Sequence, residues 1–220
     1  MKSIAILLAG SALAIGANAA TVSFNFSNAF QTTEINQTGN LGFFNSTLGT
    51  LTGVKLSFIG GNSTVLSLTN NAANSQTTKA TSTTDLFFGS SLSPLNALVT
   101  AANPVVSLSE TTGFVTLASK ASQSFGPLTD SKTIDFTTQA NTILASFIGS
   151  GDFAITCTSL SGIAIQGGGG NIASTQATQA GCGAAVEYTY TATPTQVPEP
   201  GALALVGIAL AGLAMARRKA

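Results

Sequence analysis

The sequence predicts an all-β fold, a single β-sandwich-like domain flanked by an N-terminal signal peptide and a C-terminal transmembrane helix. Three observations support this prediction. Apolar and polar residues alternate in steps of two over many short segments, and glycine- or asparagine-containing turn signals separate these segments. Helical periodicity is scarce. Strand segments recur at intervals of about ten to twenty residues, which is typical of a sandwich.

The alternation is clearest near the start of the domain, where Val-Ser-Phe-Asn-Phe covers residues 22–26. The predicted strands are residues 22–26, 51–58, 65–68, 86–88, 105–108, 114–117, 133–136, 153–158, 162–165 and 186–191. Glycine accepts positive φ and proline fixes φ, so short motifs that contain them predict turns. The predicted turns are Gly39-Asn40, Gly60-Gly61-Asn62, Asn70-Asn71, Gly126-Pro127 and Gly149-Ser150-Gly151.

Two segments, residues 93–102 and 137–147, place leucine, isoleucine and alanine at helical spacing, and each is compatible with a short helix. Residues 167–170 are four consecutive glycines. No lysine and no periodic apolar face follow them, so the context of a phosphate-binding loop is missing. We interpret this run as a hairpin or loop tip.

The N-terminus has the three parts of a secretory signal peptide, which we assign to residues 1–19. Lys2 precedes the apolar run 4–15, and Ala17-Asn18-Ala19 supplies the A-x-A pattern. We expect cleavage by signal peptidase after Ala19. The alternative is an N-terminal membrane anchor, but an apolar run of about a dozen residues is short for a hydrocarbon core of about 30 Å.

The C-terminal segment, residues 197–220, combines a proline-rich motif, an apolar stretch and a basic end. Residues 201–216 carry no charge and predict a transmembrane helix, which at 1.5 Å per residue reaches about 24 Å. The basic end, Arg217, Arg218 and Lys219, resists crossing the bilayer and predicts that the chain ends in the cytoplasm. The motif before the helix is Val197-Pro198-Glu199-Pro200.

This order of Pro-Glu-Pro, short hydrophobic helix and Arg-rich terminus resembles the PEP-CTERM sorting signal of Gram-negative bacteria. The resemblance implies processing near residues 197–200 by a membrane protease of the exosortase type. It also implies transient residence in the inner membrane, followed by display on the cell surface or release outside the cell.

The exported body, residues 20–196, has the size of one domain and few charged groups. Its four lysines and seven acidic residues give a formal charge of −3, so we expect no nucleic-acid partner. Histidine is absent from the sequence, and the body has neither arginine nor tryptophan. These absences exclude a Ser-His-Asp triad and the usual His-containing zinc sites within this chain. We expect no cofactor and no enzymatic activity.

The two cysteines, Cys157 and Cys182, reach an oxidising compartment after export, and we predict a disulfide between them. The alternatives are two buried thiols, or one thiol awaiting a partner chain. Closing a loop of about 25 residues stabilises a domain by roughly 3 to 4 kcal/mol. Asp130 and Asp135 flank a predicted junction between loop and strand, but no dense acidic motif accompanies them, so we interpret them as solvated turn residues and predict no metal site.

The body resembles the choice-of-anchor E domain over residues 24–191. The matching segments are 45–58 with its Leu-Gly-Thr-Leu motif, 63–70, 147–151 and the closing strand 186–191. The resemblance implies an exported β-rich domain that is joined to different surface-sorting tails. It implies no reaction, and no functional residue is transferred from the family.

These features favour a non-enzymatic surface or extracellular-matrix protein associated with exopolysaccharide or biofilm. The alternative function is a carbohydrate-binding module. For that function, Tyr188 and Tyr190 share one face of the last predicted strand and would stack on sugars. A third hypothesis, an enzyme, would have to use Lys120 with Ser122 or Ser124 as base and nucleophile.

Overall fold

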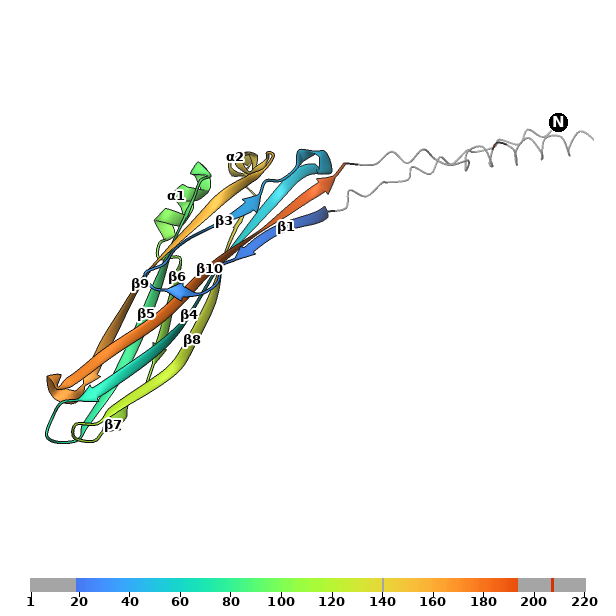
Figure 1. The fold of residues 1–220 in the computed structure, drawn as a ribbon. Helices are drawn as coiled ribbons and strands as arrows, with labels where there is room; N and C mark the ends of the chain where they lie inside the picture. The colour runs from blue at the N-terminus through green and yellow to red at the C-terminus, as the bar shows by residue number, and fades with distance from the viewer. Residues whose placement is uncertain (1–18, 140, 194–206, 208–220) are drawn as a thin grey trace, which may run out of the picture. The chain divides into compact units, whose positions relative to one another are not determined.

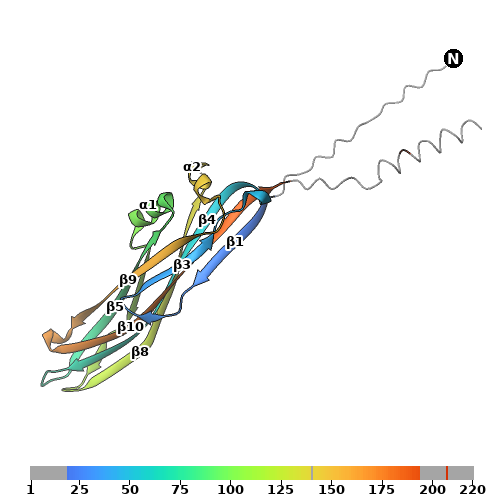
Figure 2. The ribbon, with the colours of Figure 1, turned by 45° about the horizontal axis from the view of Figure 1, so that its top comes forward.

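The structure is a computed structural model in which residues 19–139, 141–193 and 207 are described. The described residues up to Ala192 belong to one compact unit. Two antiparallel sheets pack face to face in this unit (Figure 1, Figure 2). The prediction of an all-β sandwich is therefore confirmed.

Sheet A has the strand order β1-β10-β4-β8, with the short β2 also paired to β10. Sheet B has the order β3-β9-β5-β6, with β7 also paired to β5. The strands of sheet A are β1 (Ala19–Ser27), β2 (Gln31–Thr32), β4 (Gly49–Asn70), β8 (Ser122–Thr138) and β10 (Ile172–Ala192). Those of sheet B are β3 (Asn36–Gly42), β5 (Gln76–Ser90), β6 (Val106–Thr111), β7 (Val115–Leu117) and β9 (Asp152–Gly167). At 22 residues, β4 extends about 70 Å.

Helical structure in the described residues is limited to short pieces. The predicted helix at residues 93–102 is confirmed as α1 (Ser93–Ala102). In the second helical segment, β8 continues to Thr138, and only α2 (Asn141–Leu144) and the 3₁₀ turn η2 (Ala145–Phe147) are helical. Two further 3₁₀ turns are η1 (Ser46–Leu48) and η3 (Gly168–Gly170). The glycine run forms the tip between β9 and β10, as predicted.

Three of the predicted turns are wrong, because the glycines lie inside strands. Gly39-Asn40 belongs to β3, Gly60-Gly61-Asn62 to β4 and Gly126-Pro127 to β8. Consequently β4 unites two predicted strands, 51–58 and 65–68. The strands 153–158 and 162–165 are likewise united in β9.

Neighbouring side chains explain the glycines of β3 and β4. A Cβ added at Gly39 would lie 2.2 Å from the Phe26 ring, and one at Gly60 would lie 2.2 Å from Leu86. The side chain of Phe30 covers Gly61 in the same way, with a hypothetical Cβ 3.1 Å from the ring. These glycines mark close approaches of a side chain to a strand, which is the other common role of glycine in sheets.

Gly126 lies at a β-bulge of β8. The register between β4 and β8 shifts between Thr64 and Leu66, and Gly126 adopts a φ of +122° opposite this shift. Because β8 is an edge strand, the missing N–H of Pro127 leaves no ladder bond unmade at a bulge. The two remaining turn predictions are confirmed: the chain turns directly after Asn70, and Gly151 has a φ of +81° just before β9.

The interior consists of two apolar clusters with a polar layer between them. The larger cluster contains Phe58, Phe88 and Tyr188, and the smaller one is formed by Leu66, Leu68, Ala80 and Leu117. Buried polar side chains occupy the inward positions between the clusters: Asn62, Thr64, Ser82, Thr84 and Thr178. Their hydrogen bonds include Asn62 Nδ2 to Thr84 Oγ1 at 3.0 Å and a 2.8 Å bond between the Thr64 and Thr178 hydroxyls. A bonded polar layer avoids most of the desolvation cost of burying these groups.

Candidate functional site

The C-terminal strand β10 is the element to which the sorting segment is attached. It lies between β1 and β4, paired with Ala19 of β1 through Thr191 and with Gly49 of β4 through its last residue, Ala192. The first described residue and the end of β10 therefore lie side by side in the unit. Among the predicted processing residues, Ala19 begins β1. The others, Ala17, Val197, Pro198, Glu199, Pro200, Arg217, Arg218 and Lys219, lie outside the described residues.

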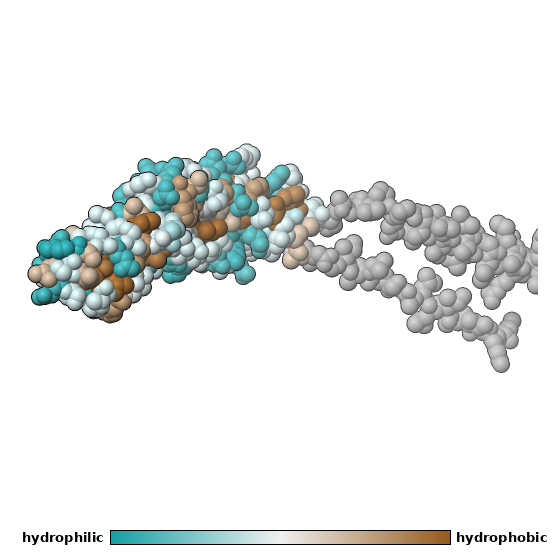
Figure 3. Space-filling model, turned by 60° about the horizontal axis from the view of Figure 1, so that its bottom comes forward, coloured by the Kyte–Doolittle hydropathy of each residue, from teal (hydrophilic) through white to brown (hydrophobic). Residues whose placement is uncertain are grey.

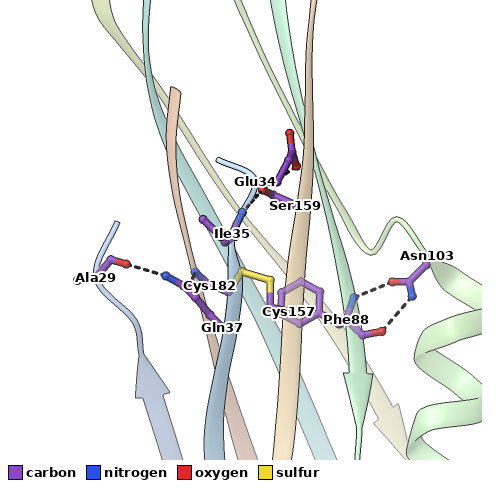
Figure 4. Close-up of a disulfide and its surroundings, with 9 residues drawn as sticks. All are labelled: Ala29, Glu34, Ile35, Gln37, Phe88, Asn103, Cys157, Ser159 and Cys182. Atoms are coloured by element: carbon purple, nitrogen blue, oxygen red, sulfur yellow. Dashed lines mark hydrogen bonds between the residues drawn. A yellow bond between two sulfur atoms is a disulfide. The ribbon is translucent and has the colours of Figure 1, made fainter. Parts of the chain in front are cut away.

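The predicted disulfide is present and joins the two sheets. Cys157 lies on β9 of sheet B and Cys182 on β10 of sheet A, with 6.4 Å between the Cα atoms (Figure 4). Both residues are buried. Cys182 lies in the middle of β10, because this strand begins well before the predicted strand 186–191 and includes Gly181 and Gly183. The bridge therefore crosslinks the layers of the sandwich as well as enclosing the glycine-rich tip.

A hydrogen-bonded strap crosses between the sheets beside this disulfide. The Gln37 side chain accepts from the Cys182 N–H at 3.0 Å and donates to the Ala29 carbonyl at 2.8 Å. The Ser159 hydroxyl accepts from the Ile35 N–H at 2.9 Å (Figure 4). The segment that leads from β1 to β3 is thus hydrogen-bonded to both cysteine-bearing strands, and the disulfide between them is buried.

The tyrosine platform predicted for sugar binding is wrong. Tyr188 is fully buried, and its hydroxyl donates to the Gly42 carbonyl at 2.8 Å. Its ring packs against Phe44, with 5.7 Å between the ring centroids, and Tyr190 packs against the same ring at 5.3 Å. The shared face of the two tyrosines is the core face of sheet A. Burial also raises the pKa of the Tyr188 hydroxyl.

Asp130 and Asp135, which we interpreted as solvated turn residues at a junction between loop and strand, both lie inside β8. Asp135 forms an ion pair with Lys55 at 2.9 Å and accepts from the Ser57 hydroxyl at 2.6 Å. The hydrogen bond from Ser57 lowers the pKa of the Asp135 carboxyl most, and the hydrogen bond from Lys55 lowers it further. Asp130 instead accepts from the N–H of Ser109 on β6 at 3.2 Å, linking the edges of the two sheets. In residues 19–139 and 141–193, no group of three or more His, Cys, Asp or Glu could hold a metal ion.

The residues of the enzyme hypothesis have other partners. The Ser122 hydroxyl pairs with Thr69 at 2.8 Å, and the Ser124 hydroxyl pairs with Ser67 at 2.7 Å. The Lys120 amine donates to the carbonyl of Asn71. The structure therefore does not bring the lysine together with either serine.

Glu110 is a buried carboxyl that the sequence analysis did not single out. It occupies an inward position of β6 beside the polar layer and is 7% exposed. Neither carboxylate oxygen forms a hydrogen bond with a described residue. Burial raises the pKa of Glu110, and the charge of Asp130 adds to this effect. The signal for this residue was its place in the alternating pattern of β6, after Val106 and Leu108.

Replacing this carboxyl should change how stability depends on pH. Because the pKa of Glu110 is higher in the folded chain, the folded state binds more protons and unfolding is favoured as pH rises. The stabilisation is complete below the ordinary value of 4.5 and is lost as pH rises through the folded pKa. Glu110→Gln should reduce the change in the free energy of unfolding with pH. It should also raise the free energy of unfolding at pH 7 by about 1–3 kcal/mol.

Urea denaturation between pH 4 and pH 8 measures both effects. The matched control is Asp152→Asn, which neutralises an exposed carboxylate at the start of β9 and should keep the wild-type slope. If the free energy of unfolding depended on pH equally in the wild-type protein and in Glu110→Gln, the raised pKa of Glu110 would be contradicted.

The described residues up to Ala192 form an all-β domain of two antiparallel sheets. Residues 196–219 match the family model of the PEP-CTERM protein-sorting motif. This motif marks the chain as an exported surface protein that is sorted by exosortase, a membrane protease. In the described part of the chain, no helix is long and apolar enough to cross a membrane. The predicted transmembrane segment 201–216 lies outside that part, except for Gly207.

No curated protein matches the chain. Among solved structures, one of infectious bursal disease virus Gt strain matches at 11% identity with a TM-score of 0.18, covering 94% of this chain and 52% of that one. A structure of the Macrobrachium rosenbergii nodavirus matches at 10% identity with a TM-score of 0.17, covering 90% and 61%. The chain thus spans about half to three fifths of the length of these viral chains.

Proposed function

We propose that this protein is a non-enzymatic surface or extracellular-matrix component of a Gram-negative bacterium. It is exported after removal of residues 1–19 and held in the inner membrane by residues 201–216. It is then processed near Val197-Pro198-Glu199-Pro200 and displayed or released into exopolysaccharide. The observation that carries the proposal is the sorting motif at 196–219, which begins four residues after Ala192, the end of β10.

The attachment of the tail to β10 supports a role in display. This strand is hydrogen-bonded along both sides, by β1 and by β4, so a force on the tail is distributed over two ladders. The disulfide at Cys182 passes the force on to sheet B. An attachment to an edge strand would have only one ladder to resist peeling.

The outer faces of the sheets support contact with a hydrated polysaccharide. Hydroxyl pairs lie along them, such as Thr77 with Thr116 at 2.8 Å on sheet B and the pair formed by Ser67 and Ser124 on sheet A. Figure 3 shows apolar residues as small separate patches among paler and hydrophilic ones. A neutral face rich in hydroxyl groups offers donors and acceptors without attracting counterions.

Membership of the body in the choice-of-anchor E family is part of the proposal. The segments that carry the resemblance fall on η1 with β4, on the turn before β9 and on the end of β10. An all-β body joined to a sorting tail is what the family resemblance implies.

Neutralising the basic end tests the sorting mechanism. Replacing Arg217, Arg218 and Lys219 with glutamine should abolish membrane retention and processing, because the positive charges hold the end of the chain on the cytoplasmic side. Immunoblots of membrane and secreted fractions, in a host with the protease, measure the processed form. Lys120→Gln is the matched control, a lysine of the body, and should be processed normally. Unchanged processing of the triple variant would overturn the mechanism.

A further inference from the structure

One end of the sandwich carries two exposed apolar side chains near the point where the chain leaves β10. Leu48 of η1 is 39% exposed, and Ile148, directly after η2, is 44% exposed. Figures 1 and 2 show the end of β10 and the start of β1 together at this end. Neither Leu48 nor Ile148 belongs to the core clusters or to the sorting motif. We call these two side chains the apolar tip.

Backbone pairing fixes Leu48 beside the exit of the chain. The next residue, Gly49, pairs with Ala192, the last residue of β10. A Cβ added at Gly49 would lie 2.0 Å from the carbonyl oxygen of Thr191, so glycine is required where the two strands approach this closely. The exposed side chain of Leu48 is therefore next to the last paired residue before the tail.

Hydrogen bonds hold Ile148 at the same end. Phe44, which precedes η1, donates its N–H to the Phe147 carbonyl at 2.8 Å and accepts from the Gly149 N–H at 3.2 Å. These two bonds pair Phe44 with Ile148 in an isolated bridge. The Phe44 ring packs against Tyr190 of β10, with 5.3 Å between the ring centroids. The two loops of the tip are thus joined to each other and to the strand that leads into the tail.

The chain around the tip is uncharged. Three segments that build this end contain no Asp, Glu, Lys or Arg: 43–51, 145–151 and 188–192. In sheet A the first charged pair, Lys55 with Glu187, lies six residues from Gly49, which is about 20 Å along the strand. In sheet B the first charged residue is Asp152, at the start of β9. An uncharged surface avoids the large cost of removing ions from water, so this end is suited to contact with lipid.

The short connection to the membrane segment determines what the tip meets. A helix over residues 201–216 reaches about 24 Å in a hydrocarbon core of about 30 Å, so the motif before it lies at the bilayer surface. The first residue of that motif, Val197, is five residues after Ala192. Five residues span at most about 18 Å. While the chain is anchored, Leu48 therefore stays close to the lipid headgroups.

We propose that the apolar tip is a membrane-contact site, where Leu48 and Ile148 enter the lipid headgroup layer of the anchored chain. The inference rests on the proposed function, because it requires residues 201–216 to lie in the bilayer. Two aliphatic side chains bind lipid weakly on their own, and the anchor makes the contact effective by keeping the tip near the surface. The contact seats the domain beside the motif that is processed and is lost when the anchor is removed.

A tryptophan placed at the tip measures the contact, because the chain contains no tryptophan of its own. The full-chain variant Leu48→Trp is placed in nanodiscs of neutral phosphatidylcholine. Its emission should shift to shorter wavelength, and bromine on the acyl chains should reduce it about twofold, since the side chain lies at the boundary of headgroups and acyl chains. Ile148→Trp should behave in the same way, which guards against a local disturbance of η1.

The matched control is Leu160→Trp, at a leucine that is 60% exposed on β9. It lies eight residues from the start of this strand, about 27 Å from the tip end, and should emit as in water without quenching. Equal quenching of Leu48→Trp and Leu160→Trp would overturn the proposal. A blue shift at both tip positions without quenching by bromine would also overturn it, because a second copy of the chain would then cover the tip.

Size-exclusion chromatography of the same samples tests the anchor separately. Chain that co-migrates with the nanodiscs but has unquenched tip tryptophans would refute the contact and leave the proposed function intact. Chain that does not co-migrate with the nanodiscs would refute both the anchor and the contact.

Discussion

Replacing Cys157 and Cys182 with alanine should lower the free energy of unfolding by about 3–4 kcal/mol. The bridge closes a sequence separation of 25 residues and joins β9 of one sheet to β10 of the other. Without it, the unfolded chain gains conformational freedom while the folded packing changes little, since alanine fills most of each small apolar site. Urea denaturation of the wild-type and double-alanine proteins at pH 7 measures the difference.

The control separates the crosslink from the packing of the sulfur atoms. Wild-type protein that is unfolded, reduced and then refolded under reductant should lose nearly as much stability as the double-alanine variant. Reductant added to the folded wild-type protein should act slowly, because both cysteines are buried. If the urea concentration at the midpoint of unfolding were the same for the oxidised and the reduced wild-type protein, the prediction would be contradicted.

The disulfide could be predicted from the sequence, but its position between the two sheets could not. Two cysteines in an exported chain have one intramolecular pairing, so the bond follows from the compartment alone. Its role as a link between sheets does not, because strand pairing is non-local: Cys182 pairs with Gly60 of β4 while Cys157 pairs with Phe88 of β5. No local pattern states which sheet a strand joins.

The misassigned glycines have the same cause. Glycine as a turn residue is a local signal, but Gly61 lies inside β4, where the Phe30 ring covers it, with a hypothetical Cβ 3.1 Å from the ring. Phe30 lies outside the predicted strand 22–26 and in another part of the chain, so no pattern near Gly61 indicates this contact.

The polar layer was hidden for a different reason. Asn62, Ser82 and Thr84 keep the period of two of their strands and point inward, but Asn62 falls in a predicted turn and the other two fall outside the predicted strands. Their polarity made them resemble loop or surface residues. Only the partners across the sandwich, such as Gln176 of β10 donating to Ser82 at 3.0 Å, make them suitable for the interior. Glu110 continues the inward alternation of Val106 and Leu108 in β6, but its charge made it resemble a surface residue.

Because Tyr188 is buried, removing its ring should lower the stability of the fold. If the ring were an exposed platform for sugars, removing it would instead lower sugar binding. Tyr188→Ala should lower the free energy of unfolding by about 3–5 kcal/mol, the usual cost of removing a buried aromatic ring. Tyr188→Phe keeps the ring and removes only the hydrogen bond to the Gly42 carbonyl, so it should cost about 1 kcal/mol. The exposed Phe114 supplies the matched control, because Phe114→Ala should change stability by at most about 0.5 kcal/mol.

Denaturation curves for the three variants, combined with retention on polysaccharide columns, separate the two roles. Tyr188→Phe remains folded and should be retained as strongly as the wild-type protein, because its ring lies among Phe44 and Phe147 with no face open to a ligand. Any loss of retention in Tyr188→Ala should follow the fraction of unfolded protein as urea is varied. A Tyr188→Ala protein with wild-type stability and no retention would place the ring on the surface and refute its role in the core.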